Sequence, residues 1–349
     1  MISERKSKLA GIKILRPGFF TTVQDKGRTG YQKFGMPESG AMDKFSYKIA
    51  NLLVGNQENV PALEFTLTGP KIKFTGNCTI ALTGASSKAY LNQCQIPNWQ
   101  SIYVPAGAVL SIEKLDKGAR GYLAFKGGLK VVEKLASSST YLRAGIGGYQ
   151  GRQLKVNDYL KTAHNQDKKD YKYRYLPASY QPDYRNEAEC RVIMGPQAEL
   201  FSQAGIKRLL NSKYRVTDQA DRMGYRLEGP EIEHSKGSDI ISDGIAAGSI
   251  QVPGHQQPIV MLADRQTTGG YPKIATVITV DIAKIAQLQP GDKVSFKKVE
   301  IEEAHKLLQA RERIYQEIVE EEFNYGPGQF FKVKINQNDY NIMIEEITD

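Results

Sequence analysis

A weak internal duplication limits the folds open to this chain more than any other feature of its sequence. Three short motifs of the first half recur in the same order in the second half. The pairs are residues 24–31 with 221–225, 64–72 with 225–232, and 104–107 with 252–254. One such match alone is at chance level, but three matches in the same order indicate a repeated unit. We therefore expect two similar domains, which the length of 349 residues also favours.

Both halves read as short β-strands separated by turn residues. In the first half, apolar or alternating runs bounded by Gly, Pro or Asn occur at residues 12–15, 62–65, 71–74, 79–82, 101–104, 109–113 and 121–125. One helical stretch, residues 43–53, interrupts them. Many short strands at this spacing are typical of a barrel or a sandwich. We predict a mainly β protein with one domain over residues 10–165 and a second over 188–299.

Two other segments differ from this strand-rich pattern. Residues 164–187 are rich in charge, proline and tyrosine. We interpret them as the link between the domains, either packed against a barrel or presenting tyrosines as a stacking platform. Residues 300–323 place apolar side chains on one helical face, which predicts an amphipathic helix. Alternating runs on either side of residues 336–339 predict a hairpin. Helix and hairpin together form a predicted C-terminal extension over residues 300–349.

Charge and cysteine content limit the functional classes. The net charge of +9 fits either a basic solvated surface or attraction of anionic partners. Lys and Arg are spread along the chain, so we predict no nucleic-acid partner. The three cysteines form no CxxC pair, so we expect no metal site and no disulfide framework. Without a signal-peptide core or a run of about 20 apolar residues, we expect a cytoplasmic protein that does not span a membrane.

The stretch from residue 251 to residue 281 concentrates the polar chemistry. Two β-branched apolar runs flank the segment 264–271, DRQTTGGY, and strands that hold such a loop usually aim it at a ligand. Asp264 and Arg265 either orient one another or bind a carboxylate and an amide, because an Arg fork suits carboxylate and phosphate. His255, in a Pro-Gly-His turn, is either a surface residue or a base.

A second polar group lies near the N-terminus, in the segments 21–28, TTVQDKGR, and 35–43, GMPESGAMD. The second segment precedes the predicted helix. Its Ser39 and Gly40 either present backbone N–H groups to an anion, or Ser39 or Asp43 simply caps the helix. Phosphate-binding loops, zinc-protease motifs and nucleophile elbows are absent from the sequence. Any activity therefore uses positioned hydrogen bonds and charges, together with a second chain.

Six segments together resemble the carboxyltransferase A/B-domain family, also called the allophanate hydrolase subunit 2 family. They are residues 21–28, 35–43, 192–197, 221–230, 248–253 and 264–273. The resemblance covers residues 12–299 and implies two cyclophilin-like β-barrel domains. It also implies a B-type partner chain with related C/D domains and a third subunit. Such a 5-oxoprolinase complex hydrolyses 5-oxo-L-proline to L-glutamate with ATP, which this chain would share with its partner.

Two other functions stay open under the same resemblance. Some family members move a carboxyl group from carboxybiotin to urea, in the urea or allophanate pathway. This chain has no Met-Lys-Met attachment site, so biotin would be carried on another chain. Another family member is a non-catalytic antagonist of a kinase inhibitor.

We assign roles to polar residues inside the matching motifs. The expected catalytic residues are Arg222, Asp264 and Arg265, with Arg222 or Arg265 binding the substrate carboxylate. The expected substrate-binding residues are Gln24, Asp25, Arg28, Gln251, Gln266 and Thr267. We also expect an apolar surface between chains, and a homo-oligomer is an option with the predicted helix as the contact.

Overall fold

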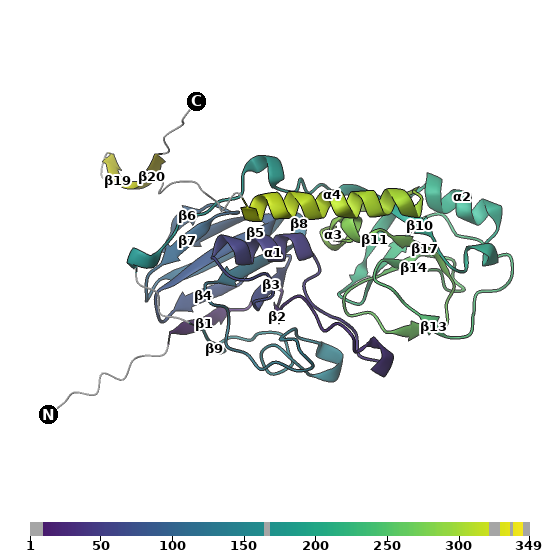
Figure 1. The fold of residues 1–349 in the computed structure, drawn as a ribbon, viewed down its shortest axis with the longest axis horizontal. Helices are drawn as coiled ribbons and strands as arrows, with labels where there is room; N and C mark the ends of the chain where they lie inside the picture. The colour runs from purple at the N-terminus through teal and green to yellow at the C-terminus, as the bar shows by residue number, and fades with distance from the viewer. Residues whose placement is uncertain (1–9, 164–167, 321–328, 336–337, 345–349) are drawn as a thin grey trace.

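The computed structural model describes residues 10–163, 168–320, 329–335 and 338–344. Two β-structures, one from each half of the sequence, lie side by side, and a long helix runs across both of them (Figure 1). In these ranges, no helix combines the length and the apolar character that crossing a membrane would require.

The first half forms a nine-stranded curled sheet. Its strands are β1 (Gly11–Arg16), β2 (Phe20–Gln24), β3 (Ala62–Thr66), β4 (Lys71–Phe74), β5 (Cys78–Leu91), β6 (Cys94–Ile96), β7 (Ser101–Val104), β8 (Val109–Phe125) and β9 (Tyr159–Lys161). The main path is β2-β3-β8-β4-β1-β9, and β5 pairs with β6, β7 and β8. In β4, Ile72 and Phe74 alternate with exposed lysines and pair with Ile14 and Ile12 of β1. This alternation fills the core on one face of the sheet.

Strands β5 and β8 are much longer than the sequence predicts. The runs 109–113 and 121–125 are two ends of one strand, and β5 extends past its predicted run at residues 79–82. The two strands stay paired because their register shifts between Gly84 and Ala89, which lets the ladder bend and continue. Gly84 has a φ of 84°, and a Cβ there would lie 2.5 Å from the carbonyl of Arg120. Only glycine fits this bend.

The second half forms a closed barrel in the order β10-β17-β14-β15-β12-β11-β18. Its strands are β10 (Glu187–Met194), β11 (Lys213–Ala220), β12 (Gly224–Glu228), β14 (Ser249–Gln251), β15 (Ile259–Met261), β17 (Lys273–Val277) and β18 (Lys293–Lys298). Parallel pairing of β10 with β18 closes the barrel, placing Cys190 opposite Phe296 in the core. The short strands β13 (Asp243–Gly244) and β16 (Thr268–Gly269) form a separate pair. The predicted mainly β fold, with its barrel architecture, is confirmed.

Four α-helices complete the described fold. They are α1 (Lys44–Leu53), α2 (Gln203–Asn211), α3 (Ile282–Ala286) and α4 (Ile301–Glu320). Short 3-10 helices are η1 (Gln32–Phe34), η2 (Leu142–Ala144), η3 (Lys168–Asp170), η4 (Ala178–Tyr180), η5 (Ala198–Leu200) and η6 (Thr279–Asp281). Asp43 caps α1, because its carboxylate accepts the backbone N–H of Ser46 at 3.1 Å. Of the two residues considered for this role, Asp43 fills it and Ser39 does not.

Helix α4 connects the two domains. Tyr315 and Ile318 pack with α1 on the first domain, whereas Ala304 packs with Ile278 and Val280 on the second. The predicted C-terminal helix is thus confirmed to Glu320, and its last predicted residues lie outside the described ranges. The predicted hairpin is also confirmed, as strands β19 (Gln329–Ile335) and β20 (Asn338–Ile344), with residues 336–337 outside the description.

The segment between the domains packs against the first sheet. The hydroxyl of Tyr171 donates to the carbonyl of Ser101 at 2.8 Å, and that of Tyr184 donates to the Asp43 carboxylate at 2.7 Å. Residues 164–167 of the predicted linker lie outside the described ranges. The described tyrosines therefore favour the packed interpretation of this segment over a free stacking platform.

Candidate functional site

Arg222 lies where the two domains meet. It occupies the turn between β11 and β12, and its side chain is 5% exposed. Its Nε and Nη2 each lie 3.0 Å from an oxygen of Asp264. Its Nη1 donates to Glu64 in β3, and Nη2 also donates to the carbonyl of Gly40 at 2.7 Å. One guanidinium therefore links the barrel to the first sheet.

Two opposing effects set the pKa of Arg222: burial and the nearby carboxylates. Burial alone would lower the pKa of Arg222, but Asp264 and Glu64 outweigh it and raise the pKa. Four of the five N–H groups that an arginine offers are occupied by these contacts. In this arrangement Arg222 fixes the positions of two carboxylates. Two of the three residues expected to be catalytic, Arg222 and Asp264, are therefore in direct contact.

A buried hydrogen-bond network that the sequence did not reveal surrounds this pair. Oε2 of Glu64 accepts the hydroxyl of Tyr122 and the backbone N–H of Met42, both at 2.8 Å. Gln287 donates to Asp43 at 2.9 Å. One signal was available: Glu64 interrupts the apolar run 62–65, and a carboxylate buried in a strand needs partners.

Asp25 holds a buried polar segment against β2. Its carboxylate accepts the N–H of Gly27 at 2.8 Å and the hydroxyl of Ser137 at 2.7 Å, and it also accepts from Ser138 and Ser139. Residues 137–140 are all buried, although a run of four hydroxyl residues reads as a surface loop. Asp25 thus holds residues 137–139 against the end of β2.

The same segment surrounds two further predicted residues. Arg28 is completely buried and donates to the carbonyl of Ser139, but its Nη1 has no partner. Burial lowers the pKa of Arg28, and the nearby charges of Asp25 and Asp264 oppose this effect. Gln24 donates to the carbonyl of Thr140 at 3.3 Å, while its Oε1 lacks a partner. The structure therefore brings Gln24, Asp25 and Arg28 together.

The remaining predicted residues form a second group. Arg265 donates through Nε to the carbonyl of Ile245 at 2.9 Å, and its Nη2 lies 3.4 Å from Glu38. Burial lowers the pKa of Arg265, with Glu38 opposing it. Among the described residues, Arg265 shares no side-chain hydrogen bond with Arg222.

The predicted amide and hydroxyl residues lie near Arg265. The side-chain amides of Gln251 and Gln266 both lie beside Gly269. Gln251 donates to the carbonyl of Tyr271 at 3.3 Å, and the carbonyl of Thr267 accepts the N–H of Ile245 at 2.9 Å. Gln251 ends strand β14 of the barrel, and Gln266 and Thr267 directly precede β16. His255 is exposed in its turn, which agrees with the surface interpretation.

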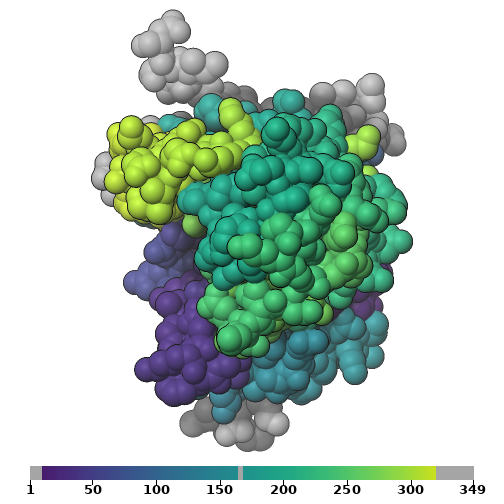
Figure 2. Space-filling model, turned by 90° about the vertical axis from the view of Figure 1, so that its right-hand side faces the viewer, coloured from purple at the N-terminus to yellow at the C-terminus, as the bar shows by residue number. Residues whose placement is uncertain are grey.

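Two cavities flank the domain junction. The first, which we call the junction cavity, has a volume of about 350 Å³, and its lining includes Arg120, Arg143, Arg222 and Asp264. The second, which we call the α4 cavity, has a volume of about 490 Å³ and is bounded by α4, the start of α1 and the turn at Arg265. Figure 2 shows α4, in yellow, beside the second domain, with the purple start of the first domain lower on the same side. Asp264 and Arg265 are consecutive, yet each lines a different cavity.

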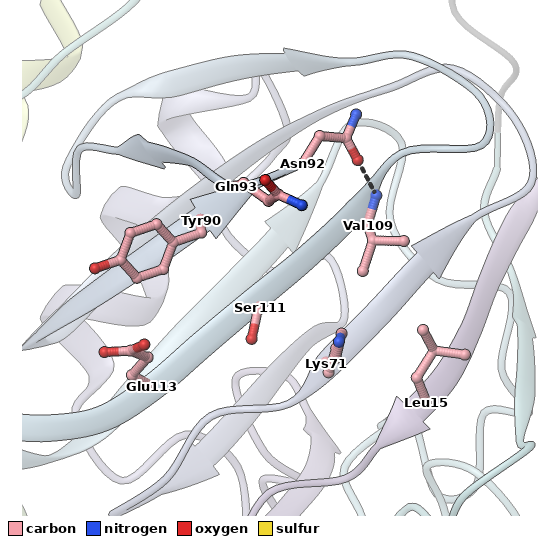
Figure 3. A pocket seen from close by; sticks show the side chains of 8 residues that line it. All are labelled: Leu15, Lys71, Tyr90, Asn92, Gln93, Val109, Ser111 and Glu113. Carbon is pink, nitrogen blue, oxygen red and sulfur yellow. Dashed lines mark hydrogen bonds between the residues drawn. The ribbon is translucent and has the colours of Figure 1, made fainter.

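A larger cavity of about 650 Å³ lies on the first sheet, away from the predicted residues (Figure 3). Lys71, Ser111 and Glu113 line it from β4 and β8, and Asn92 accepts the N–H of Val109 at 2.8 Å beside it. Its polar side chains are exposed or half-buried. We therefore place the functional site at the domain junction, where buried charges converge. In the described parts of the chain, no cluster of three or more His, Cys, Asp or Glu could hold a metal ion.

Comparisons with known proteins agree with this architecture. The family described as carboxyltransferase domain, subdomain A and B, matches residues 34–298. The chain is 37% identical to the C subunit of 5-oxoprolinase from Escherichia coli, over 88% of this chain and 97% of that protein. It is 33% identical to urea amidolyase of Saccharomyces cerevisiae, over 86% of this chain but 17% of that protein. The crystal structure of the K. lactis urea amidolyase superposes with a TM-score of 0.85 at 32% identity, covering 91% of this chain and 20% of that one.

Proposed function

Because the chain belongs to the family of carboxyltransferase domains, subdomain A and B, we propose that it is a subunit of an ATP-dependent 5-oxoprolinase. The observation that carries this proposal is the extent of the match to the C subunit of 5-oxoprolinase. Two bacterial proteins of that name are matched over 97% and 92% of their lengths. The urea amidolyases are matched over only 17% and 18% of theirs.

In this proposal 5-oxo-L-proline binds in the junction cavity. The substrate carries a carboxylate and a lactam amide, so it needs a cation and hydrogen-bonding groups. Arg143 is exposed at the cavity, and the buried Nε of Arg120 has no partner. Both guanidinium groups line the cavity and suit the carboxylate. Arg222 acts as a positioning residue that fixes Asp264 beside the substrate.

The proposal includes partner chains. A B-type subunit and a third subunit would complete the enzyme, and ATP would be shared with the B-type partner because this chain has no familiar phosphate loop. Phe19 and Leu142 are exposed apolar residues that line the junction cavity. Exposed apolar groups beside a polar site are typical of a protein contact. They supply the predicted surface between chains.

Reconstitution with the partner subunits tests this function. We expect ADP release that depends on 5-oxo-L-proline and requires this chain. Arg143→Gln removes a proposed carboxylate ligand and should raise KM for 5-oxo-L-proline about tenfold or more. Arg185→Gln is the matched control, because Arg185 is an exposed arginine that pairs with Asp183 and lines neither cavity. Full activity without this chain would overturn the assignment.

A further inference from the structure

The α4 cavity contains an unusual collection of cationic side chains. Lys44, Lys48, Arg265 and Arg311 line it, against the acidic side chains of Glu38 and Glu312, while Lys48 also pairs with Glu58 at 2.6 Å. Two long arginines therefore approach one space from different elements, since Arg265 belongs to the second domain and Arg311 to α4. This excess of positive charge attracts an anion.

Packing holds the two arginines in place. The guanidinium of Arg311 lies over the ring of Phe45 at 5.1 Å and donates to the carbonyl of Val280 at 2.5 Å. Arg265 is buried and anchored by the carbonyls of Ile245 and Leu262, leaving Nη2 directed toward Glu38. Both side chains are preorganised, so little conformational entropy is lost when a ligand binds.

Ser39 supplies an independent observation in the same cavity. Its side chain is 2% exposed, and its Oγ has no hydrogen-bond partner. A buried hydroxyl without a partner is costly in a folded protein. Its φ is 55°, and its N–H is held by the carbonyl of Ala263 at 3.0 Å. Such a conformation is strained for a serine, and strain of this kind concentrates at ligand sites.

We propose that the α4 cavity binds a phosphate-bearing ligand with an apolar body. Arginine forks and a hydroxyl donor suit phosphate oxygens, and several cations offset the double charge of a phosphate monoester. The apolar body would lie on Ala41, Met42, Ala246 and Ala263, which also line the cavity. A volume of about 490 Å³ is within the range of small-molecule sites, roughly 300–1,000 Å³.

Helix α4 determines much of this site, although it follows the residues 34–298 that match the family. Arg311 and Tyr315 would thus set the ligand preference of this chain through its C-terminal extension. The inference does not depend on the proposed 5-oxoprolinase activity, because the site is complete within one chain.

Isothermal titration calorimetry of the full chain with phenyl phosphate tests the inference. We expect one site per chain, tighter binding than for inorganic phosphate or for benzoate, and weakening at high salt. Arg311→Gln and Arg265→Gln should each weaken binding at least about tenfold, because each removes a cation that lines the cavity. Ser39→Ala should weaken it severalfold.

Matched variants separate binding from folding. Arg313→Gln changes an exposed arginine of the same helix outside the cavity and should bind like the unaltered chain. Lys44→Gln changes an exposed lining residue that belongs to α1. It therefore tests whether a lining cation contributes to binding even if Arg311→Gln disturbs α4. The inference fails if phenyl phosphate does not bind at millimolar concentration, if benzoate binds as tightly, or if Arg313→Gln weakens binding as much as Arg311→Gln. None of these outcomes bears on activity of the reconstituted complex, so the two proposals fail separately.

Discussion

Arg222 and Arg215 both lie in the second domain and both bind carboxylates. Their ion pairs differ in burial, and therefore in how much they contribute to the free energy of unfolding. The Arg222 side chain is 5% exposed, and its two acidic partners are buried with it. The Arg215 and Glu228 side chains are 57% and 60% exposed. Water and salt screen the second pair, whereas the contacts of Arg222 with Glu64 and Asp264 are buried and screened far less.

Arg222→Gln is therefore expected to lower the free energy of unfolding by about 3–5 kcal/mol, because it removes the charged partner that two buried carboxylates share. Arg215→Gln, the exposed counterpart, should change it by less than about 1 kcal/mol. Urea denaturation of both variants measures the difference. Equal effects for the two substitutions would show that the Arg222 contacts contribute little to stability.

Single residues also show what the sequence could and could not predict. Asp264 and Arg222 belong to conspicuous polar motifs, so their association was predictable. The contact of Arg222 with Glu64 was not, since Glu64 lies 158 positions away along the chain. Residues 137–140 look like a polar surface loop, and only the position of Asp25 explains their burial. Contacts between distant segments carry this information, and local patterns do not contain it.

Individual elements show the same division between local and distant information. The amphipathic pattern predicted α4, but not that its apolar face would cover both domains. The alternation in β4 predicted a strand, whereas the length of β5 and β8 depends on bulges that local patterns do not reveal. Helical and strand periods are local, but the surface an element covers is a property of the fold.

Helix α4 should contribute stability through its buried face. Ile318 is 3% exposed and packs with α1, whereas its neighbour Val319 is 37% exposed. Ile318→Ala is expected to lower the free energy of unfolding by about 2–5 kcal/mol, and Val319→Ala by much less. Thermal and chemical denaturation compare the two. A larger loss for Val319→Ala would mean that α4 packs through another face.

The contact between β10 and η6 predicts a pH dependence. Burial would raise the pKa of Asp281, but hydrogen bonds from Arg191 and the charge of Lys284 outweigh it and lower the pKa. A carboxylate with a depressed folded pKa stabilises the fold above its unfolded pKa of about 4, and this contribution is lost as the pH falls through the folded value.

Asp281→Asn should therefore be less stable than the unaltered protein at pH 7, with a smaller loss of stability between pH 5 and pH 3. Equilibrium unfolding at a series of pH values measures both curves. Parallel curves for the two proteins would show that Asp281 has the same pKa in both states.

The molecule as a whole is predicted to unfold as one unit, because Arg222 and Gln287 join the domains and α4 lies across them. The single tryptophan, Trp99, packs with α1 and α4, so its fluorescence reports on the first domain and the helix. Circular dichroism reports on both domains.

In the unaltered protein, the fluorescence and dichroism transitions should coincide. In Arg222→Gln, which cuts one connection between the domains, the two midpoints should separate. Coincident transitions in that variant would mean that α4 and the Gln287 contacts are sufficient to couple the domains.

Asp264 and Arg265 are joined by one peptide bond, but Asp264 lines the junction cavity and Arg265 lines the α4 cavity. A movement of this dipeptide on binding in one cavity would shift a residue that lines the other. Occupancy of the two spaces is consequently expected to be thermodynamically linked, so that a ligand on one side changes the affinity for a ligand on the other by an equal and reciprocal factor.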